Sequence, residues 1–231
     1  MSARRGHAAV LTGRARAAVS EAAFLRLLGL LFERPREGWR DEARSLAGVQ
    51  EHKELSETAM TGLEATEGDY LRLFGPGGLV SPREVAYRRF TDPALTLADL
   101  STLYDAFGFR PRAEDPLDHI AVETGFAGYL AMKEAYALSR RDREAAQRTR
   151  EARALFLESH LRPFAAGLGP RLRSAGPPDY LDSAARILAG WSGCEALEPL
   201  EDERTIDPPE EGELTCGGCD SGPSCDQEVM K

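Results

Sequence analysis

Apolar residues recur at every third or fourth position along most of the chain, which is the spacing of one face of an α-helix. Runs of alternating apolar and polar residues, typical of β-strands, are nearly absent, and the helix formers Ala, Leu, Glu and Arg predominate. The pattern therefore predicts an all-α fold. The predicted helices cover residues 20–34, 41–49, 54–74, 96–107, 141–168 and 178–191, with a further helix starting at residue 115.

Several predicted helix ends are marked by residues that favour such positions. Ser20 suits the N-cap of the first helix, and Pro35 ends that helix. Gly75-Pro76-Gly77-Gly78 ends another helix, and Ser81-Pro82 suits the start of the next. We do not interpret the glycines as a phosphate-binding loop, because no strand precedes them and no Lys-Ser/Thr pair follows.

The size and composition of the chain indicate one folded domain with two tails. Its 231 residues, 42% of them hydrophobic, are enough for one sizeable core. We expect a basic, mobile arm at residues 1–18, an all-helical domain at residues 19–194, and an acidic linker with a Cys-rich tail at residues 195–231. The linker, from Glu195 to Glu213, contains nine acidic residues, one basic residue and three prolines, which predicts disorder.

The charge and the apolar runs exclude several classes of partner. A formal charge of -9 disfavours nucleic acid and anionic membranes, because a negative field repels both. The longest apolar stretch, residues 24–32, is far shorter than the roughly 20 residues of a membrane span. Arg14 and Arg16 interrupt the apolar region that an export signal after Arg4 and Arg5 would need. Because the cysteines are also crowded near one end, we expect a cytoplasmic protein.

One short segment contains the densest group of candidate functional side chains. Asp115 suits an N-cap, Pro116 the first helical position, and Asp118 a place where the helix dipole favours negative charge. His119 and Glu123 would lie one turn apart, either as a partly buried hydrogen-bonded pair or as a catalytic or metal-binding pair. A hydrolase that uses His119 with Asp118 or Glu123 ranks last, because no nucleophile or oxyanion site accompanies them.

Four segments of the helical region carry a resemblance to a known family. They are Tyr70-Leu71-Arg72-Leu73-Phe74-Gly75-Pro76-Gly77-Gly78, then Ser81-Pro82-Arg83-Glu84 with Tyr87, then Asp115-Pro116-Leu117-Asp118-His119-Ile120, and then Phe156-Leu157-Glu158-Ser159-His160-Leu161 before Pro163 and Phe164. Their order and spacing resemble the TorD/DmsD/NarJ family of redox-enzyme maturation chaperones, over roughly residues 20 to 190.

The resemblance implies an all-α chaperone of the cytoplasm and not an enzyme. Its expected partner is the apo form of a molybdoenzyme catalytic subunit, or that subunit's twin-arginine signal peptide, bound before cofactor insertion. Carboxylates would receive client arginines, and apolar faces would receive apolar client residues. The candidate client-binding residues are Asp115, Asp118, His119, Glu123, Glu84, Pro82, Tyr87 and Phe126. Both a monomer and a homodimer are compatible with the sequence.

The sequence departs from the family pattern in two places. Residues 124–129, Thr-Gly-Phe-Ala-Gly-Tyr, are smaller than the apolar residues usual in the family, which predicts a wider groove or a more pliable helix. The loop after Gly78 is also shorter than usual, and Pro82 and Glu84 are the clearest remnants of the family pattern there.

The cysteines near the C-terminus suggest a second function on which the family resemblance is silent. Cys216, Cys219 and Cys225 have the spacing of metal ligands, and Cys194 is a candidate fourth ligand for zinc or an iron–sulfur centre. A reversible disulfide and a tail that binds nothing are the alternatives, and the neighbouring acidic residues disfavour thiolates. The alternative function is therefore a metal-dependent sensor or electron carrier acting through Cys216–Cys225.

Overall fold

The computed structural model describes residues 13–112 and 115–194, where all secondary structure is helical apart from one isolated β-bridge. The predicted all-α fold is confirmed. The helices are α1 (Gly13–Leu31), α2 (Trp39–Val49), α3 (Lys53–Gly62), α4 (Glu67–Phe74), α5 (Pro93–Phe107), α6 (Ile120–Ser139), α7 (Arg143–Phe156), α8 (Arg162–Ser174) and α9 (Asp179–Ser192). A 3₁₀ turn, η1 (Glu84–Tyr87), and a π-helical turn, η2 (Leu157–Leu161), complete the set. The predicted tail at residues 195–231 lies outside the described residues.

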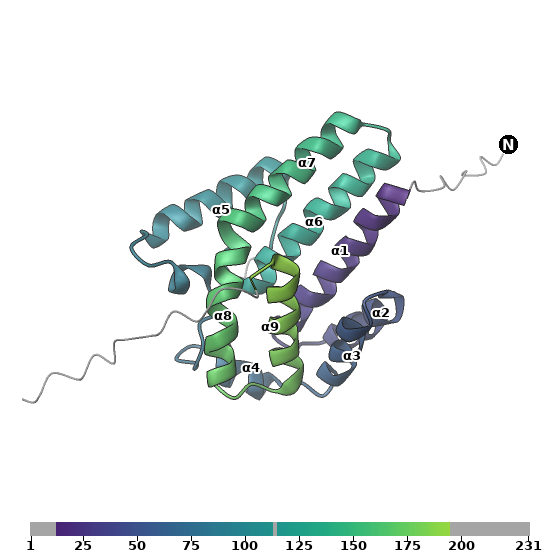
Figure 1. The fold of residues 1–231 in the computed structure, drawn as a ribbon. Coiled ribbons are helices and arrows are strands. Elements are labelled where there is room, and N and C mark those ends of the chain that lie inside the picture. The colour runs from purple at the N-terminus through teal and green to yellow at the C-terminus, as the bar shows by residue number, and fades with distance from the viewer. Residues whose placement is uncertain (1–12, 113–114, 195–231) are drawn as a thin grey trace, which may run out of the picture. The chain divides into compact units, whose positions relative to one another are not determined.

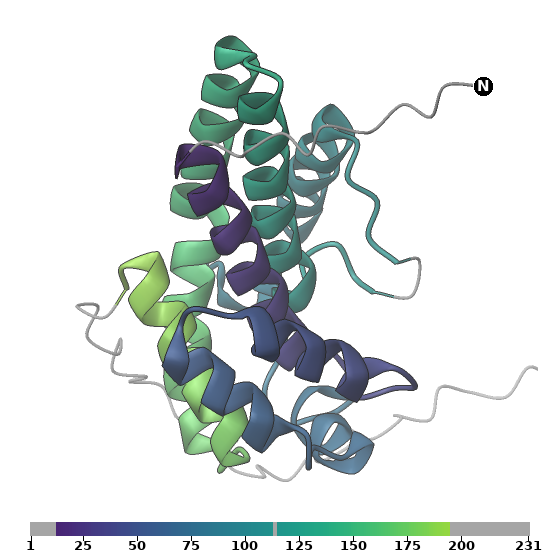
Figure 2. The ribbon, with the colours of Figure 1, turned by 90° about the vertical axis from the view of Figure 1, so that its right-hand side faces the viewer.

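Helix α1 organises the packing of this helical domain. It runs along α6, and α6 is followed by α7 as its antiparallel neighbour (Figure 1). Helices α2, α3 and α9 contact α1 as well, and two perpendicular views place them around its C-terminal part (Figure 2). Since α1 meets partners on several sides, we expect its C-terminal half to be apolar around most of its circumference.

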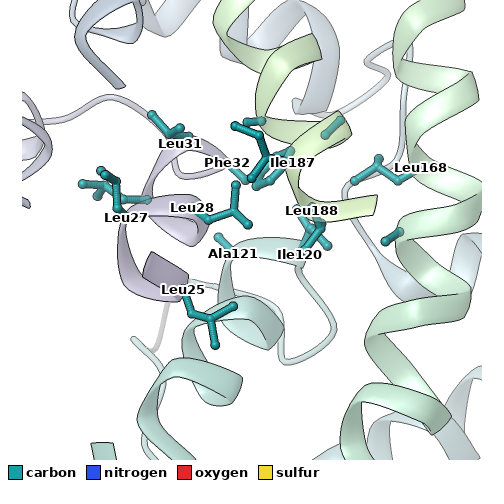
Figure 3. Packing of buried hydrophobic residues seen from close by; sticks show 14 of the residues in the cluster. Leu25, Leu27, Leu28, Leu31, Phe32, Ile120, Ala121, Leu168, Ile187 and Leu188 are labelled. Carbon is teal, nitrogen blue, oxygen red and sulfur yellow. The ribbon is translucent and has the colours of Figure 1, made fainter. Parts of the chain in front are cut away.

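The C-terminal half of α1 forms the centre of the hydrophobic core. Its leucines are at most 1% exposed, and they are Leu25, Leu27, Leu28, Leu30 and Leu31. Phe32 follows directly and is also fully buried, close to Ile187 and Leu188 of α9 (Figure 3). Each such side chain contributes about 2 kcal/mol when it leaves water. The apolar run at residues 24–32 is therefore a core helix segment.

Glycines allow α1 and α6 to approach each other closely. A Cβ atom added to Gly128 of α6 would lie 3.1 Å from Leu25 Cβ and 3.3 Å from the Ala22 carbonyl oxygen. A Cβ atom on Gly125, one turn earlier, would meet nothing within 4 Å. The two glycines of the unusual 124–129 segment thus have different surroundings, since one lies in a helix contact and the other faces open space.

Several predicted helix boundaries are wrong. Helix α1 begins at Gly13, not near Ser20, because the small residues Ala15 and Ala18 are buried and continue its packed face. Residues 13–18, which the pattern assigned to the arm, are therefore helical, and the rest of the arm lies outside the described residues.

The predicted helix at residues 54–74 is in fact two helices, α3 and α4. The Arg40 guanidinium donates hydrogen bonds to the carbonyls of Leu63 and Ala65, at 2.8 and 2.7 Å, and so satisfies the backbone between them. The Thr66 hydroxyl then accepts a hydrogen bond from the Asp69 N–H at 3.1 Å and caps α4. The break depends on a side chain distant in sequence, which a local pattern does not reveal.

A buried ionic network connects α1, α6 and α7. Glu134 of α6 accepts hydrogen bonds from Arg150 at 2.6 Å and from Arg153 at 3.2 Å, and both arginines lie on α7. Arg153 also forms an ion pair with Glu21 of α1 at 2.6 Å.

Within residues 13–112 and 115–194, every helix is too short or too polar to cross a bilayer.

We expect Gly128→Ala to lower stability and Gly125→Ala to raise it. Alanine at position 125 gains the helix propensity of roughly 0.5–1 kcal/mol without a clash. At position 128 the same gain is outweighed by crowding against α1, for a net loss of roughly 1 kcal/mol. Urea unfolding of the two variants measures both effects, and equal shifts would contradict the close contact between α1 and α6.

Candidate functional site

The segment before α6 is extended rather than helical. The Glu84 N–H donates to the Asp118 carbonyl and the Ile120 N–H donates to the Pro82 carbonyl, both at 2.9 Å, and these bonds form the isolated bridge between Arg83 and His119. The predicted helix start at Asp115 is therefore wrong, since α6 begins at Ile120 with His119 as its N-cap. The backbone pairing of residues 82–84 with residues 118–120 overrides the local capping signal.

His119 is a buried, uncharged cap. Its Nδ1 accepts a hydrogen bond from the Ala121 N–H at 3.1 Å, so the ring proton lies on Nε2 and points to the Tyr70 oxygen, also at 3.1 Å. Burial lowers the pKa of His119 to about 4, although the charge of Asp118 partly opposes this. Both ring nitrogens are engaged, so the imidazole is not placed to act as a general base.

Asp118 ties the extended segment to the loop before α5. Its side chain is fully buried, and its Oδ1 accepts a hydrogen bond from Arg83 Nε at 2.9 Å. Its Oδ2 accepts a longer bond from the Val85 N–H at 3.4 Å. A buried carboxylate is tolerated when charge and hydrogen-bond donors compensate it, and Arg83 and Val85 supply both here.

Glu84 and His160 form a second buried pair. Glu84 is 1% exposed, and its carboxylate lies 3.1 Å from His160 Nδ1 and forms an ion pair with Arg88. His160 belongs to the π-helical turn η2, where the ring stacks on Phe156 with centroids 5.4 Å apart. Such turns change the direction of the side chains that follow and are frequent at functional sites. Arg88 also donates to the Ser159 carbonyl, which fixes η2 against η1.

Glu123 is a fully buried carboxylic acid. Burial raises its pKa well above the ordinary value, and the neighbouring charges of Glu84 and Asp118 raise it further. Neither carboxyl oxygen has a partner at hydrogen-bond geometry. The predicted pair of His119 and Glu123 does not form, because the two His119 ring nitrogens contact Tyr70 and the Ala121 N–H instead.

The other candidate residues have four different environments. The Tyr87 hydroxyl donates to the Ser81 carbonyl at 2.7 Å, and the Arg171 guanidinium lies 4.6 Å from the centre of the Tyr87 ring. Phe126 has no exposed surface and packs against other aromatic rings, with the Tyr104 ring centroid 4.7 Å away. The Pro82 carbonyl accepts the hydrogen bond from the Ile120 N–H. Asp115 is half-buried at the edge of a groove.

This groove is lined in part by Asp115 of the family segment at residues 115–120. It encloses about 470 Å³ between α1, α2, α6 and the loop residues 109–112 and 115. Its apolar lining comes from Phe109, Pro111, Val122, Tyr129 and Met132, and Gly125 leaves space between them. Its carboxylates are Glu33, Glu42 and Asp115. We call this surface the α1–α6 groove.

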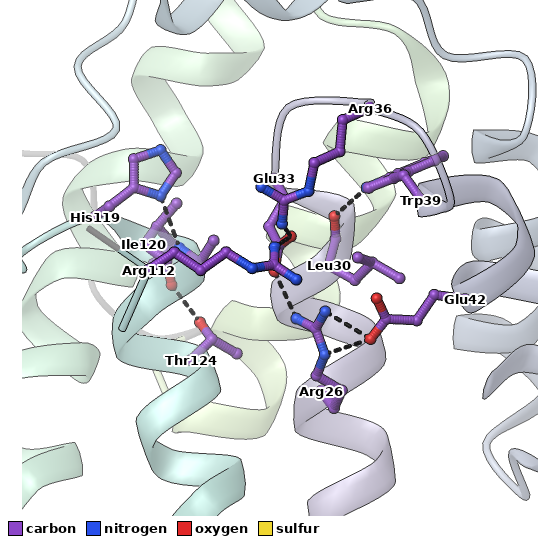
Figure 4. A network of polar contacts seen from close by, with 11 residues as sticks. Arg26, Leu30, Glu33, Arg36, Trp39, Glu42, Arg112, His119, Ile120 and Thr124 are labelled. Carbon is purple, nitrogen blue, oxygen red and sulfur yellow. Dashed lines mark hydrogen bonds and ion pairs between the residues drawn. The ribbon is translucent and has the colours of Figure 1, made fainter. Parts of the chain in front are cut away.

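Glu33 anchors one wall of the α1–α6 groove. Its carboxylate forms ion pairs with Arg26 at 2.5 Å, Arg36 at 2.6 Å and Arg112 at 3.1 Å (Figure 4). Arg112 belongs to the loop at residues 109–115, so this contact connects that loop to the end of α1. The groove therefore already accommodates guanidinium groups beside a carboxylate.

The proposed metal site is only partly within the described residues. Cys194 is buried, its thiol lies 2.8 Å from the Ser192 hydroxyl, and it donates to the Arg162 carbonyl at 3.2 Å. Burial raises the pKa of this thiol, so the protonated form, which is a poor metal ligand, is favoured. The residues of the described ranges contain no group of three or more side chains placed to hold a metal ion. Cys216, Cys219 and Cys225 lie outside the described residues.

Several residues of this site were not singled out from the sequence. Tyr70, Arg83 and His160 lie in the family segments, and those segments were the signal that could have identified them. Arg88 follows η1 directly and lacks such a signal. Glu33 was missed because its arginine partner Arg112 lies 79 residues away.

We expect Glu123→Gln to change how stability depends on pH. In the unfolded chain Glu123 is ionised above its ordinary pKa of 4.5, whereas in the folded protein it keeps its proton, so folding loses stability as the pH rises. Glutamine removes this cost, and the variant should gain on the natural protein by up to about 1.4 kcal/mol per pH unit above pH 5. Urea unfolding at pH 5, 6, 7 and 8 measures the difference, and a pH-independent offset would refute it.

His119→Asn tests the opposite pH dependence, a loss of stability as the pH falls. The folded protein keeps His119 neutral down to about pH 4, whereas the unfolded chain takes up the proton below 6.5, so acid costs the folded state roughly 3 kcal/mol across this range. Asparagine retains an N-cap acceptor but does not titrate. Between pH 7 and pH 4.5 the variant should therefore lose less stability than the natural protein. Parallel losses would mean that His119 is not held neutral.

A comparison with known protein families identifies the family of this chain. The sequence model of the nitrate reductase delta subunit family matches residues 23–168, which is more than half of the chain and includes all four family segments. A search of curated proteins finds no match. Proteins of this family are maturation chaperones for molybdoenzymes. The chain therefore belongs to the nitrate reductase delta subunit family, a family of NarJ/TorD-type chaperones.

Proposed function

We propose that this protein is a cytoplasmic chaperone that binds the catalytic subunit of a molybdenum-containing oxidoreductase before its cofactor is inserted. Family membership supports the class of client. The bound part is proposed to be a segment that carries both basic and apolar residues, such as a twin-arginine signal. In this proposal residues 13–194 form the chaperone domain, because α1 begins at Gly13, and they act by binding and not by catalysis.

The observation that carries the proposal is the α1–α6 groove beside the family segment at residues 115–120. Its apolar walls suit apolar client side chains, and the space over Gly125 admits them. Glu42 in its lining already pairs with Arg26 at 2.6 Å, so a client arginine would join a site that accepts guanidinium groups. This combination fits an amphipathic basic peptide better than a small polar metabolite.

The buried candidate residues have a supporting role in this proposal. Asp118, Glu123 and Glu84 are at most 1% exposed, so they do not reach a client in this conformation. Asp118 instead holds the segment before α6 against η1, and Glu84 holds η1 against η2. We infer that the family segments determine the shape of the binding surface from inside the domain.

The cysteines are not needed for client binding in this proposal. Deleting the residues after Glu213 should leave client binding largely intact, whereas an electron carrier or sensor acting through Cys216–Cys225 would lose its activity. The deletion therefore separates the chaperone from the alternative function.

Filling the groove tests where the client binds. Leucine at position 125 would occupy the space over Gly125, whereas Gly48→Leu places the same side chain on an exposed part of α2 with nothing within 4 Å of its Cβ atom. Each tagged protein is used for affinity capture from its native host grown by anaerobic respiration, and retained proteins are identified by mass spectrometry. We expect a molybdoenzyme catalytic subunit with the natural protein and with Gly48→Leu, and at least a tenfold loss with Gly125→Leu, equivalent to about 1.4 kcal/mol.

Two outcomes would count against this assignment. If the natural protein captured no molybdoenzyme subunit, the chaperone function would be wrong for this chain. If Gly125→Leu captured as much as Gly48→Leu while both remained folded by circular dichroism, the client would bind elsewhere on the surface.

A further inference from the structure

A second concave surface lies at the end of the α6–α7 pair. It encloses about 910 Å³ between the start of α1, the end of α6 and the first turns of α7. It is lined by Gly13, Arg14, Leu138, Arg141, Arg143, Ala146, Gln147 and Arg150. We call this surface the basic cleft, because four arginines and no carboxylate line it. It shares no lining residue with the α1–α6 groove.

Three of the four arginines carry charge that nearby acids do not neutralise. Arg150 is bound to Glu134, but within the described part of the chain Arg14, Arg141 and Arg143 have no ion pair or side-chain hydrogen bond. The nearest acids in sequence are otherwise engaged, since Asp142 caps α7 and Glu144 pairs with Arg148. Unpaired positive charge in a chain with a formal charge of -9 is unexpected from composition alone.

Arg141 occupies a backbone position that favours glycine. It has a φ of 61°, and the end of α6 is closed by hydrogen bonds from the Arg141 N–H to the Leu138 carbonyl at 3.0 Å and from the Asp142 N–H to the Ala137 carbonyl at 2.9 Å. This is the helix ending in which a left-handed residue, most often glycine, follows the helix. An arginine there costs backbone energy, and Arg141 lines the cleft.

We propose that the basic cleft binds an acidic peptide segment of a partner protein. Each guanidinium presents a planar set of donors that matches a carboxylate, and several lie in one concavity. The lining residues include no aromatic ring on which a nucleobase could stack. A short acidic segment matches the size of the cleft and meets only its local positive charge, whereas a nucleic acid or an anionic bilayer would extend beyond the cleft over a domain with nearly balanced acidic and basic residues.

Removing the two arginines at the α6–α7 turn tests the proposal. The variant Arg141→Gly with Arg143→Gln removes two charges and also relieves the backbone at position 141, so its unfolding temperature should not fall. The control, Arg44→Gln with Lys53→Gln, removes the same charge from exposed positions on α2 and α3. A fluorescein-labelled glutamate-rich peptide is titrated with each full-length protein and followed by anisotropy at low salt.

We expect the cleft variant to bind this peptide roughly tenfold more weakly, the control variant to bind like the natural protein, and added salt to weaken binding. The matching glutamine-rich peptide should not bind. Gly125→Leu should bind the acidic peptide normally, so failure of the client proposal and failure of this one remain distinguishable.

Three outcomes would overturn the proposal. Equal affinities of the cleft and control variants would mean that net charge, and not the cleft, attracts the peptide. Inorganic tripolyphosphate is added at the same total negative charge as the peptide. If it displaces the peptide, the cleft is a general anion site. Arginine-dependent binding to phosphatidylglycerol vesicles without peptide binding would assign the cleft to a membrane surface.

Discussion

The buried carboxylate of Asp118 is the constraint on which the centre of this protein depends. It has no exposed surface, so it needs both an opposite charge and hydrogen-bond donors, and Arg83 and the Val85 N–H supply them. This contact holds the loop before α5 beside the segment before α6, and the backbone bonds of Glu84 and Ile120 follow from it. Helix α6 consequently begins at Ile120.

The polar groups around Asp118 are partitioned into charged and uncharged members. His119 is kept neutral by burial and caps α6, and Glu123 one turn later is kept protonated by burial and by its acidic neighbours. Glu84 lies beside His160 of the π-helical turn and forms an ion pair with Arg88. The region around Asp118 therefore accommodates three carboxyl groups, of which Glu123 carries no charge.

This arrangement explains how segments typical of a chaperone family can matter without touching a client. The segments meet inside the helical domain, and the surface they support is the α1–α6 groove. In this groove Gly125 leaves open space, and Glu33 forms ion pairs with three arginines. The basic cleft near Arg141 is a separate surface with the opposite charge preference. In our proposals the two surfaces bind different segments, one basic and apolar and the other acidic.

The helical class, most helices and the family were predictable from the sequence, because periodic apolar positions and capping residues act over a few residues. The positions of the candidate residues were not, because they depend on contacts between residues far apart in the chain. Asp115 has the local features of an N-cap, yet pairing with residues 82–84 moves the start of α6 to Ile120. Likewise the exposure of a carboxylate is set by what packs over it, so only the tertiary structure placed Asp118 and Glu123 in the interior and opened the groove beside them.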